Sequence, residues 1–283
     1  MDILTLVIFI LIFIVILLIG VMIYDGNRFV VENYEIKDER VLNETKFVFL
    51  TDLHNKQYGT GNVRLIDEVK KLKPDMILIG GDLYIAKPGK STDVASDLIS
   101  KLKEIAPVCY GMGNHEYRSS IYTENYGSMY EDYANKLATL GVKILNNEFT
   151  DFNEFRIYGL SIDRAYYKRF VNIYMDESYI PSIIKKPEND KINIFLAHNP
   201  DYFENYVKAG AKLSLSGHVH GGVARLPFVG GLFSPKITLF PIYDGGEYKI
   251  NDSSMIVSRG LGVHTIPFRL FNPAEISVIT FKK

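Results

Sequence analysis

The chain has 283 residues, 47% of them apolar, so it is long enough for one large domain of about 250 residues plus an appendage. Its 32 basic residues nearly balance its 33 acidic ones, so it carries no electrostatic footprint of a nucleic-acid-binding protein. The single cysteine, Cys109, excludes an internal disulfide, and its apolar surroundings predict a small buried side chain.

Residues 3–23 form an apolar run that Thr5 and Gly20 alone interrupt. A helix of this length, at about 1.5 Å per residue, matches the ~30 Å hydrocarbon core of a bilayer. The alternative is a cleaved signal peptide, but its apolar run is about 7 to 15 residues, with a basic residue before it and a small-residue cleavage site after it. The run therefore predicts a single-pass transmembrane helix and a cell-membrane location. Arg28 is the only nearby basic residue and Asp25 lies beside it, so the side of the membrane stays open.

Residues 24–45 are polar and mixed, and we expect a juxtamembrane connection with a short strand at 29–36. A regular alternation of apolar runs and helical spacing follows from residue 46. It predicts strands at 46–52, 75–82 and 108–116, and helices at 63–73 and 93–105. This β-α-β-α-β order indicates a parallel sheet with right-handed crossovers.

The remaining chain continues as one domain, because it contains no internal repeat and no low-complexity linker. We expect helices at 129–140 and near 202–208, and strands at 142–145, 155–160, 192–198, 212–218 and 275–281. The predicted organisation is therefore a transmembrane helix at 3–23, a connection at 24–45 and one domain at 46–283.

Polar side chains gather where the predicted strands end, and five of the six histidines are among them. In open α/β sheets the functional groups gather beyond the carboxyl ends of strands. The side chains concerned are Asp52, His54, Asp82, Asn114, His115, His198, His218 and His220.

Carboxylate, amide and imidazole groups without thiolate form an oxygen and nitrogen ligand set that suits Mn, Fe, Zn or Co. Seven ligands are too many for one ion, but they fit two divalent ions about 3.5 to 4 Å apart that share a bridging carboxylate. Such a pair activates water and stabilises in-line displacement at phosphorus. Glycines beside the ligands, such as Gly81, Gly113 and Gly217, permit tight turns and close backbone approach.

The order DLH, GD, GNHE, a distant His and GHVHGG resembles the calcineurin-like metallophosphoesterase superfamily, from Lys46 to the end of the chain. The stretches RLPFVGG (225–231) and SRGLGVHTIPFRLFNPAEI (258–276) look like its membrane-anchored or exported bacterial branch. The resemblance implies an α/β fold, a four-layer αββα sandwich of two mixed β-sheets flanked by helices, here preceded by one N-terminal transmembrane helix. It also implies two divalent metal ions, with manganese favoured.

The resemblance further implies a role for each site residue. Asp52, His54 and His220 would bind the first ion, Asn114, His198 and His218 the second, and Asp82 would bridge them. His115 would be the general acid, the alternative being a structural histidine beside the ligands.

The chain departs from the family pattern at one position near this acid. Many relatives read G-D-x-x-D, where the second Asp supports the catalytic His, but Ile85 stands there in this chain. Glu116 is a candidate substitute, and the orienting group of His115 stays open. His264 lies outside the metal pattern, and we expect it to be structural or at the rim of the site.

The leading hypothesis is a membrane-anchored two-metal phosphohydrolase that cleaves a phosphomonoester, phosphodiester or pyrophosphate through a metal-activated hydroxide. The alternative is a noncatalytic metal-bearing module that binds phosphate, and a nuclease ranks last. The substrate is a phosphorylated small molecule or a lipid-linked phosphate, and no protein partner can be inferred. The apolar segment 223–235 either packs into the domain core or lines a rim for the bilayer or an acyl chain, with Arg225 approaching the phosphate and Phe228 in the rim.

Overall fold

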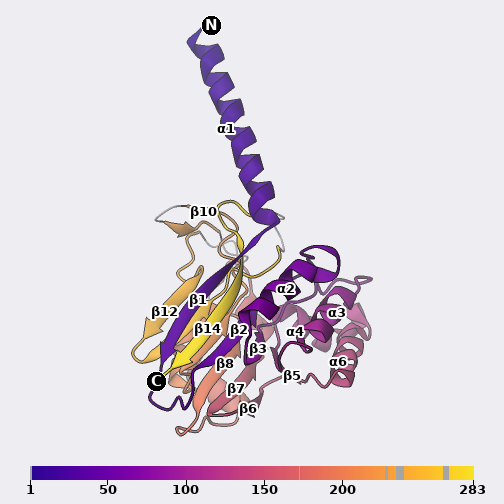
Figure 1. Ribbon diagram of the computed structural model, residues 1–283, viewed down its shortest axis with the longest axis vertical. Coiled ribbons are helices and arrows are strands. Elements are labelled where there is room, and N and C mark those ends of the chain that lie inside the picture. Colours follow the sequence, from indigo (N-terminus) through magenta and orange to yellow (C-terminus); the bar gives the residue numbers. More distant parts are fainter. Residues whose placement is uncertain (1, 172, 227–228, 234–238, 264–267) are drawn as a thin grey trace.

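The computed structural model describes residues 2–171, 173–226, 229–233, 239–263 and 268–283, so the expectations for Phe228 and His264 lie outside the described residues. Helix α1 (Ile3–Gly26) begins at Asp2, whose side chain accepts a hydrogen bond from the Thr5 N–H, and it stands apart from the rest of the chain (Figure 1). Among the described residues, α1 is the one helix long and apolar enough to cross a membrane.

The first sheet has six strands in the order β1-β14-β2-β3-β4-β5. Neighbouring strands are parallel except for β14 and β2, which run antiparallel. The bounds are β1 (Phe29–Lys37), β14 (Ala274–Lys282), β2 (Thr45–Leu50), β3 (Met76–Ile79), β4 (Val108–Gly111) and β5 (Ile144–Leu145). The strand expected in the juxtamembrane connection is therefore present, and it forms the edge of this sheet beside the last strand of the chain (Figure 1).

The second sheet also has six strands, in the order β12-β13-β9-β8-β7-β6. Its inner strands are parallel, and an antiparallel strand closes each edge. The bounds are β12 (Gly246–Ile250), β13 (Ser253–Val257), β9 (Leu213–Ser216), β8 (Ile192–Ala197), β7 (Phe155–Leu160) and β6 (Glu148–Phe152). A separate two-stranded ribbon joins β10 (Arg225–Leu226) to β11 (Gly230–Gly231).

The inner strands are apolar on both faces because each sheet is covered on both sides. In β2, Phe47 and Phe49 face a core cluster shared with Ile194 of β8, whereas Val48 and Leu50 face the helices on the other side. Helices α2 (Val63–Leu72), α3 (Asp93–Leu102) and α6 (Met129–Thr139) cover the first sheet. The shorter α7 (Tyr179–Ile183) and α8 (Phe203–Lys208) cover the second. The four-layer sandwich of two mixed sheets is thus confirmed.

The expected strand 108–116 is too long at its carboxyl end. Strand β4 stops at Gly111, and α4 (Asn114–Ile121) begins three residues later, followed by α5 (Thr123–Tyr126). The side chain of Glu116 accepts a hydrogen bond from the Gly113 N–H, which satisfies a backbone donor at the start of the helix. Asn114 and His115 are therefore the first residues of a helix and not the last of a strand.

Candidate metal centre

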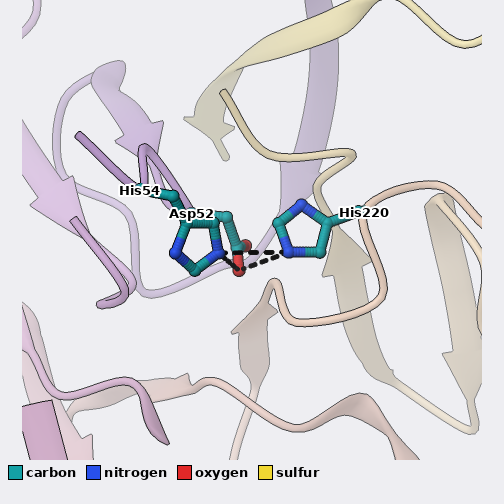
Figure 2. A group of neighbouring side chains, drawn as sticks. All are labelled: Asp52, His54 and His220. Carbon is teal, nitrogen blue, oxygen red and sulfur yellow. Dashed lines mark hydrogen bonds and ion pairs between the residues drawn. The ribbon is translucent and has the colours of Figure 1, made fainter. Parts of the chain in front are cut away.

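The carboxyl ends of β2, β3, β8 and β9 meet at one edge of the two sheets, and polar residues follow each end. Asp52, His54 and His220 form one group there (Figure 2). Nε2 of His54 lies 3.7 Å from Oδ1 of Asp52, and Nε2 of His220 lies 3.5 Å from the same oxygen. The two imidazole nitrogens are 3.2 Å apart. Three donor atoms from distant parts of the chain therefore face one small volume.

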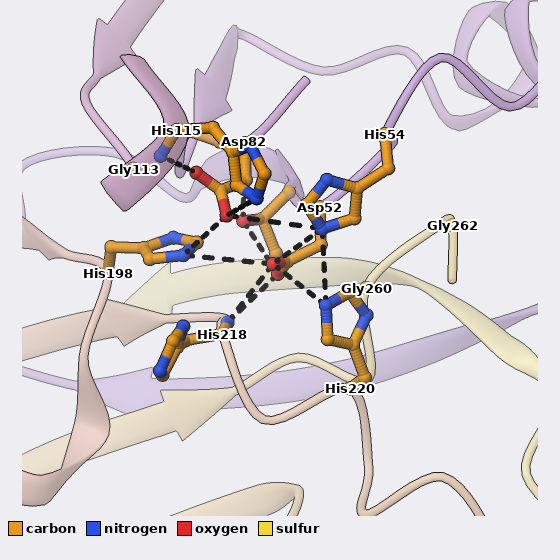
Figure 3. Close-up of polar contacts among 12 residues, drawn as sticks. Asp52, His54, Asp82, Gly113, His115, His198, His218, His220, Gly260 and Gly262 are labelled. Carbon is orange, nitrogen blue, oxygen red and sulfur yellow. Dashed lines mark hydrogen bonds and ion pairs between the residues drawn. The ribbon is translucent and has the colours of Figure 1, made fainter. Parts of the chain in front are cut away.

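Asp82 and His198 extend this group towards the second sheet (Figure 3). Nε2 of His198 lies 3.3 Å from Oδ2 of Asp82 and 3.7 Å from Oδ1 of Asp52. His54 and His115 each place Nε2 3.9 Å from Oδ2 of Asp82. By distance, both aspartates occupy the middle of the cluster.

Of the two remaining expected ligands, His218 contacts the same cluster. The backbone N–H of His218 donates to both carboxylate oxygens of Asp52, at 3.2 and 3.0 Å. Its ring packs against the His198 ring with centroids 5.4 Å apart. The buried amide oxygen of Asn114 accepts no hydrogen bond from the residues that the structure describes. The structure therefore brings together seven of the eight side chains that the sequence singled out, and Asn114 precedes one of them, His115, in the chain.

The backbone at these positions is unusual for residues with side chains. Asp52, His54, Asp82, His218 and His220 all have φ between 49° and 68°, in the left-handed region. Such conformations are costly for residues other than glycine, and they cluster at functional sites. The sharp turns after the strand ends thus aim the ligands at a common centre.

Nδ1 of His198 lies 2.8 Å from the carbonyl oxygen of Gly80, which can only accept a hydrogen bond. Nδ1 therefore carries a proton, and Nε2, which faces Asp82 and Asp52, is the ring atom that a metal ion would bind in place of its proton. His115 has the opposite arrangement, because its Nδ1 accepts a hydrogen bond of 2.8 Å from the Ala86 N–H. The neutral His115 ring must then carry its proton on Nε2, which faces the cluster as a donor.

Glu116 does not orient His115. Its carboxylate accepts hydrogen bonds from the N–H groups of Asp82 and Leu83 and from the Tyr110 hydroxyl, at 2.7 to 3.1 Å. Burial and the Asp82 charge raise the pKa of Glu116 to about 7. Glu116 thus fastens the loop of Asp82 to the start of α4. The Ala86 N–H, with an Arg118 nitrogen 3.3 Å from Nδ1 of His115, lies where the family's second Asp would act.

The buried carboxylates of the cluster require positive charge nearby. Burial alone would raise the pKa of Asp52, but the nearby His220 and His198 lower it below its ordinary value. Burial lowers the pKa of His198, and the carboxylates of Asp82 and Asp52 outweigh this and raise it to about 10. Buried carboxylates need compensating positive charge. Two divalent ions supply that charge, and the oxygen and nitrogen donors present fit them.

Several supporting residues were not singled out from the sequence. Gly260 packs against the Asp52 side chain so closely that a Cβ would collide with it, and the Gly262 N–H donates to the Asp52 carbonyl. The buried Arg269 donates to the carbonyls of both glycines, and the Tyr167 ring packs on His218. In the sequence, the glycines of the stretch SRGLG (258–262) indicate this loop.

A cavity of 420 Å³ adjoins the cluster at His218. One wall comes from Tyr174 and Met175, and another from residues 240–243. Asp201, just before α8, and Glu204, in its first turn, also line the cavity. The cluster therefore has room beside it for a group larger than phosphate.

Two expectations about the segment 223–235 can be compared with the structure. The Arg225 guanidinium forms an ion pair of 3.2 Å with Asp244 and donates to the carbonyl of Gly221, the residue after His220, so it is already engaged. The described apolar residues Leu226, Val229 and Phe233 are each at least 40% exposed. They therefore do not pack into the domain core.

Comparison with known proteins agrees with this centre. The model of the calcineurin-like phosphoesterase family matches residues 45–222. An uncharacterised metallophosphoesterase of Helicobacter pylori is 30% identical over 85% of this chain and 60% of its own length. Phosphodiesterase YaeI of Escherichia coli is 30% identical over 77% of this chain and 75% of its own length.

The chain thus spans about 60% of the length of the Helicobacter pylori relative. Among solved structures, TT1561 of Thermus thermophilus aligns with a TM-score of 0.48 at 12% identity, over 77% of this chain and 91% of its own. The family match covers every expected ligand, from Asp52 to His220. The chain therefore belongs to the calcineurin-like phosphoesterase family, and residues 45–222 form part of a metal-dependent phosphoesterase domain.

Proposed function

We propose that this chain is a membrane-anchored two-metal phosphodiesterase. The observation that carries the proposal is the convergence of two carboxylates and five imidazoles on one buried centre, in which His115 presents N–H while His198 offers Nε2 to a metal ion. The name of the Escherichia coli relative, a phosphodiesterase, favours a diester over a monoester or a pyrophosphate.

The ligand roles follow the two ends of the cluster. Asp52, His54 and His220 would hold one ion, since their donor atoms lie within 4.8 Å of one another. Asn114, His198 and His218 would hold the other, and Asp82, which lies near both His54 and His198, would bridge them. When bound, the two ions polarise the phosphoryl oxygens and lower the pKa of a water nucleophile. Manganese is the favoured metal, because this donor set suits it without a thiolate.

We assign His115 as the donor to the departing alcohol oxygen: its neutral ring would hydrogen-bond that oxygen through Nε2–H and offset the negative charge that develops there. Its Nε2–H faces the centre, and the Ala86 N–H holds the ring in that tautomer. A ring that presents N–H cannot bind a metal through the same atom. This geometry favours an enzyme over the alternative, a noncatalytic metal-bearing module that binds phosphate, because a module needs no proton donor.

We assign residues 3–23 to a membrane span, residues 24–45 to the connection and residues 46–283 to the phosphoesterase domain, so the protein belongs to the cell membrane. No part of the apolar stretch of α1 is buried in the domain, which supports this assignment, since a helix of a water-soluble core would be buried. A lipid-linked phosphodiester is the proposed substrate. The anchor keeps the centre close to lipids, and the exposed Leu226, Val229 and Phe233 lie in the loop after His220.

The test uses the full chain purified in detergent and loaded with Mn²⁺. We expect two ions per chain by elemental analysis, and hydrolysis of bis-p-nitrophenyl phosphate that stops with a chelator and returns with Mn²⁺. A lipid phosphodiester in mixed micelles should be cleaved faster than its water-soluble headgroup analogue. Binding of inorganic phosphate with two bound ions but no turnover of any ester would favour the noncatalytic module instead.

A further inference from the structure

The inner end of the apolar helix is fixed directly to the loop that carries a predicted metal ligand. Asp25, in the last turn of α1, is only 2% exposed. Its carboxylate accepts a hydrogen bond of 3.1 Å from the Asn272 N–H and pairs with Arg28 at 2.9 Å. The Asn272 side chain then donates to the His220 carbonyl at 2.8 Å. Two residues therefore connect the helix to the metal centre.

Further contacts fix the same end of α1 to the segment after Asp52. The Lys56 ammonium donates to the Gly26 carbonyl at 2.5 Å, and Arg64 donates to the Asn27 carbonyl at 3.4 Å. Strand β1 begins at once, with Phe29 paired to Ala274. Because β14 runs antiparallel to β2, its start lies where β2 ends, at the edge of the metal centre (Figure 1). The helix is thus seated on this edge and not tethered through a flexible linker.

Exposed apolar side chains extend from the same edge. They come from the ribbon β10–β11 and from the segment before β12, and the ribbon lies near the base of α1 (Figure 1). We call them the apolar rim: Leu226, Val229, Phe233, Leu239, Phe240 and Ile242, which are 40% to 82% exposed.

The rim is continuous with both the cavity and the helix. Phe240 and Ile242 line the cavity that reaches His218. Phe271 is 46% exposed and precedes Asn272, the residue that holds Asp25. Exposed apolar patches of this kind mark interaction surfaces, and apolar side chains beside a membrane helix lie in the headgroup and acyl boundary.

We propose that the apolar rim docks on the same bilayer that holds α1, so that the metal centre and its cavity open towards the lipid headgroups. The proposal rests on the membrane anchor assigned above and adds a second, peripheral contact to it. The contacts at the end of α1 fix the orientation of the domain relative to the bilayer, and the apolar rim determines how deeply the domain enters the headgroup layer. A phosphodiester in the headgroup layer then reaches the metal centre without leaving the membrane.

The chain contains no tryptophan, so one introduced tryptophan reports its own depth. The full chain is reconstituted in nanodiscs that contain phospholipids brominated on the acyl chain, as Phe240→Trp, Ile242→Trp or Leu42→Trp. Leu42 is the matched control, because it is 79% exposed and lies between β1 and β2 at the opposite edge of the sheet. We expect bromine to reduce the emission of both rim variants at least twofold and to leave that of Leu42→Trp unchanged.

Equal quenching of the rim variants and Leu42→Trp would overturn the docking proposal. The same samples test the anchor and the enzyme separately. Elution of every variant with the nanodiscs supports the anchor, and hydrolysis of soluble bis-p-nitrophenyl phosphate supports the phosphodiesterase. Anchored, active protein with an unquenched rim therefore refutes docking alone, and a quenched rim in protein that hydrolyses nothing supports docking while the proposed function fails.

Discussion

The backbone N–H of Ala86 donates a hydrogen bond of 2.8 Å to Nδ1 of His115. A backbone N–H can only donate, so this contact fixes the proton of the neutral imidazole on Nε2, towards the metal centre. A guanidinium nitrogen of Arg118 lies 3.3 Å from the same Nδ1 and also donates to the Ala86 carbonyl. A carboxylate at this place would accept a proton from Nδ1, whereas the Ala86 N–H donates to it, so the orientation of His115 in this chain differs from that in relatives with the second Asp.

Replacement of this histidine tests the proton donor. His115→Ala should slow esters of poor leaving groups about 10² to 10⁴-fold, because a positioned acid contributes about that much. Esters of p-nitrophenol should be slowed far less, since that oxygen departs without a proton. The measurement is kcat for an alkyl and a p-nitrophenyl diester, together with metal content.

His198→Ala is the matched control, because His198 offers Nε2 to a metal ion from the same cluster. It should lose metal and slow both substrates alike, whereas His115→Ala keeps two ions. If His115→Ala slowed both substrates by the same factor, His115 would act through binding or structure.

Asp82 lies within 3.9 Å of histidines from both ends of the cluster. Asp82→Asn should therefore reduce the bound metal to less than one ion per chain and abolish turnover, because a neutral amide bridges two cations poorly. His54→Ala, which removes a ligand from one end, should leave about one ion. Elemental analysis after gel filtration decides between them, and two retained ions with normal turnover in Asp82→Asn would exclude a bridge.

The glycine before Asn114 is needed for steric reasons. A Cβ on Gly113 would collide with the Asp82 carboxylate and with the Asp82 backbone nitrogen. We expect Gly113→Ala to displace that carboxylate, to reduce metal binding and to lower the melting temperature by several degrees, since overpacking typically costs about 1 to 3 kcal/mol. Gly20→Ala is a control for the added methyl group, since a Cβ at Gly20 contacts nothing within 4 Å and its φ lies in the ordinary range. Normal metal content in Gly113→Ala would show that the loop of Asp82 can move to accommodate the added methyl group.

The sequence predicted which side chains gather at the cluster, because they follow strand ends within short motifs. It did not predict that Asn114 begins a helix, since Gly113 and Glu116 define that start through a hydrogen bond to the backbone. It also missed the Ala86 contact, because every residue except proline carries an N–H and its direction depends on the fold. It also did not predict the ion pair between Arg225 and Asp244, which lies nineteen residues later in the chain.

The pairing of β1 with β14 also could not be predicted from the sequence. Residues 29–37 contact 274–282, and no local pattern reports a partner so far along the chain. The inner strands β2, β3, β8 and β9 could be predicted because they are apolar on both faces, whereas β12, which alternates between half-buried and exposed residues, and its inner neighbour β13 were not recognised.

Removal of the metal should destabilise the domain. Asp52 and Asp82 are buried side by side with histidines, and without cations their charges are only partly compensated. A ligand at 100 times its Kd stabilises a protein by about 2.7 kcal/mol, which corresponds to about 5 to 10 °C in Tm for a domain of this size. Thermal unfolding with chelator, and again after Mn²⁺ is restored, measures the shift. The shift should be largely absent in Asp82→Asn, and an unchanged Tm in the native chain would contradict a buried metal centre.

The last prediction concerns the seat of the apolar helix. Asp25→Ala removes the hydrogen bond to Asn272 and the ion pair with Arg28, but it leaves the bond from Asn272 to His220 intact. We expect hydrolysis of soluble bis-p-nitrophenyl phosphate to stay within about twofold of the native rate, because no group at the centre changes. Hydrolysis of a lipid phosphodiester in nanodiscs should fall about tenfold, since α1 no longer holds the centre towards the headgroups and productive orientations become rarer.

Glu35→Ala provides the control, because Glu35 lies on β1 and forms an exposed ion pair of 2.7 Å with Lys282, and such pairs contribute about 0 to 1 kcal/mol. It should change neither rate. If Asp25→Ala lowered both rates by the same factor, the contact would support the fold of the centre and not its orientation. If it lowered neither, the domain would reach lipids without a fixed helix, and the apolar rim alone would determine its approach to the membrane.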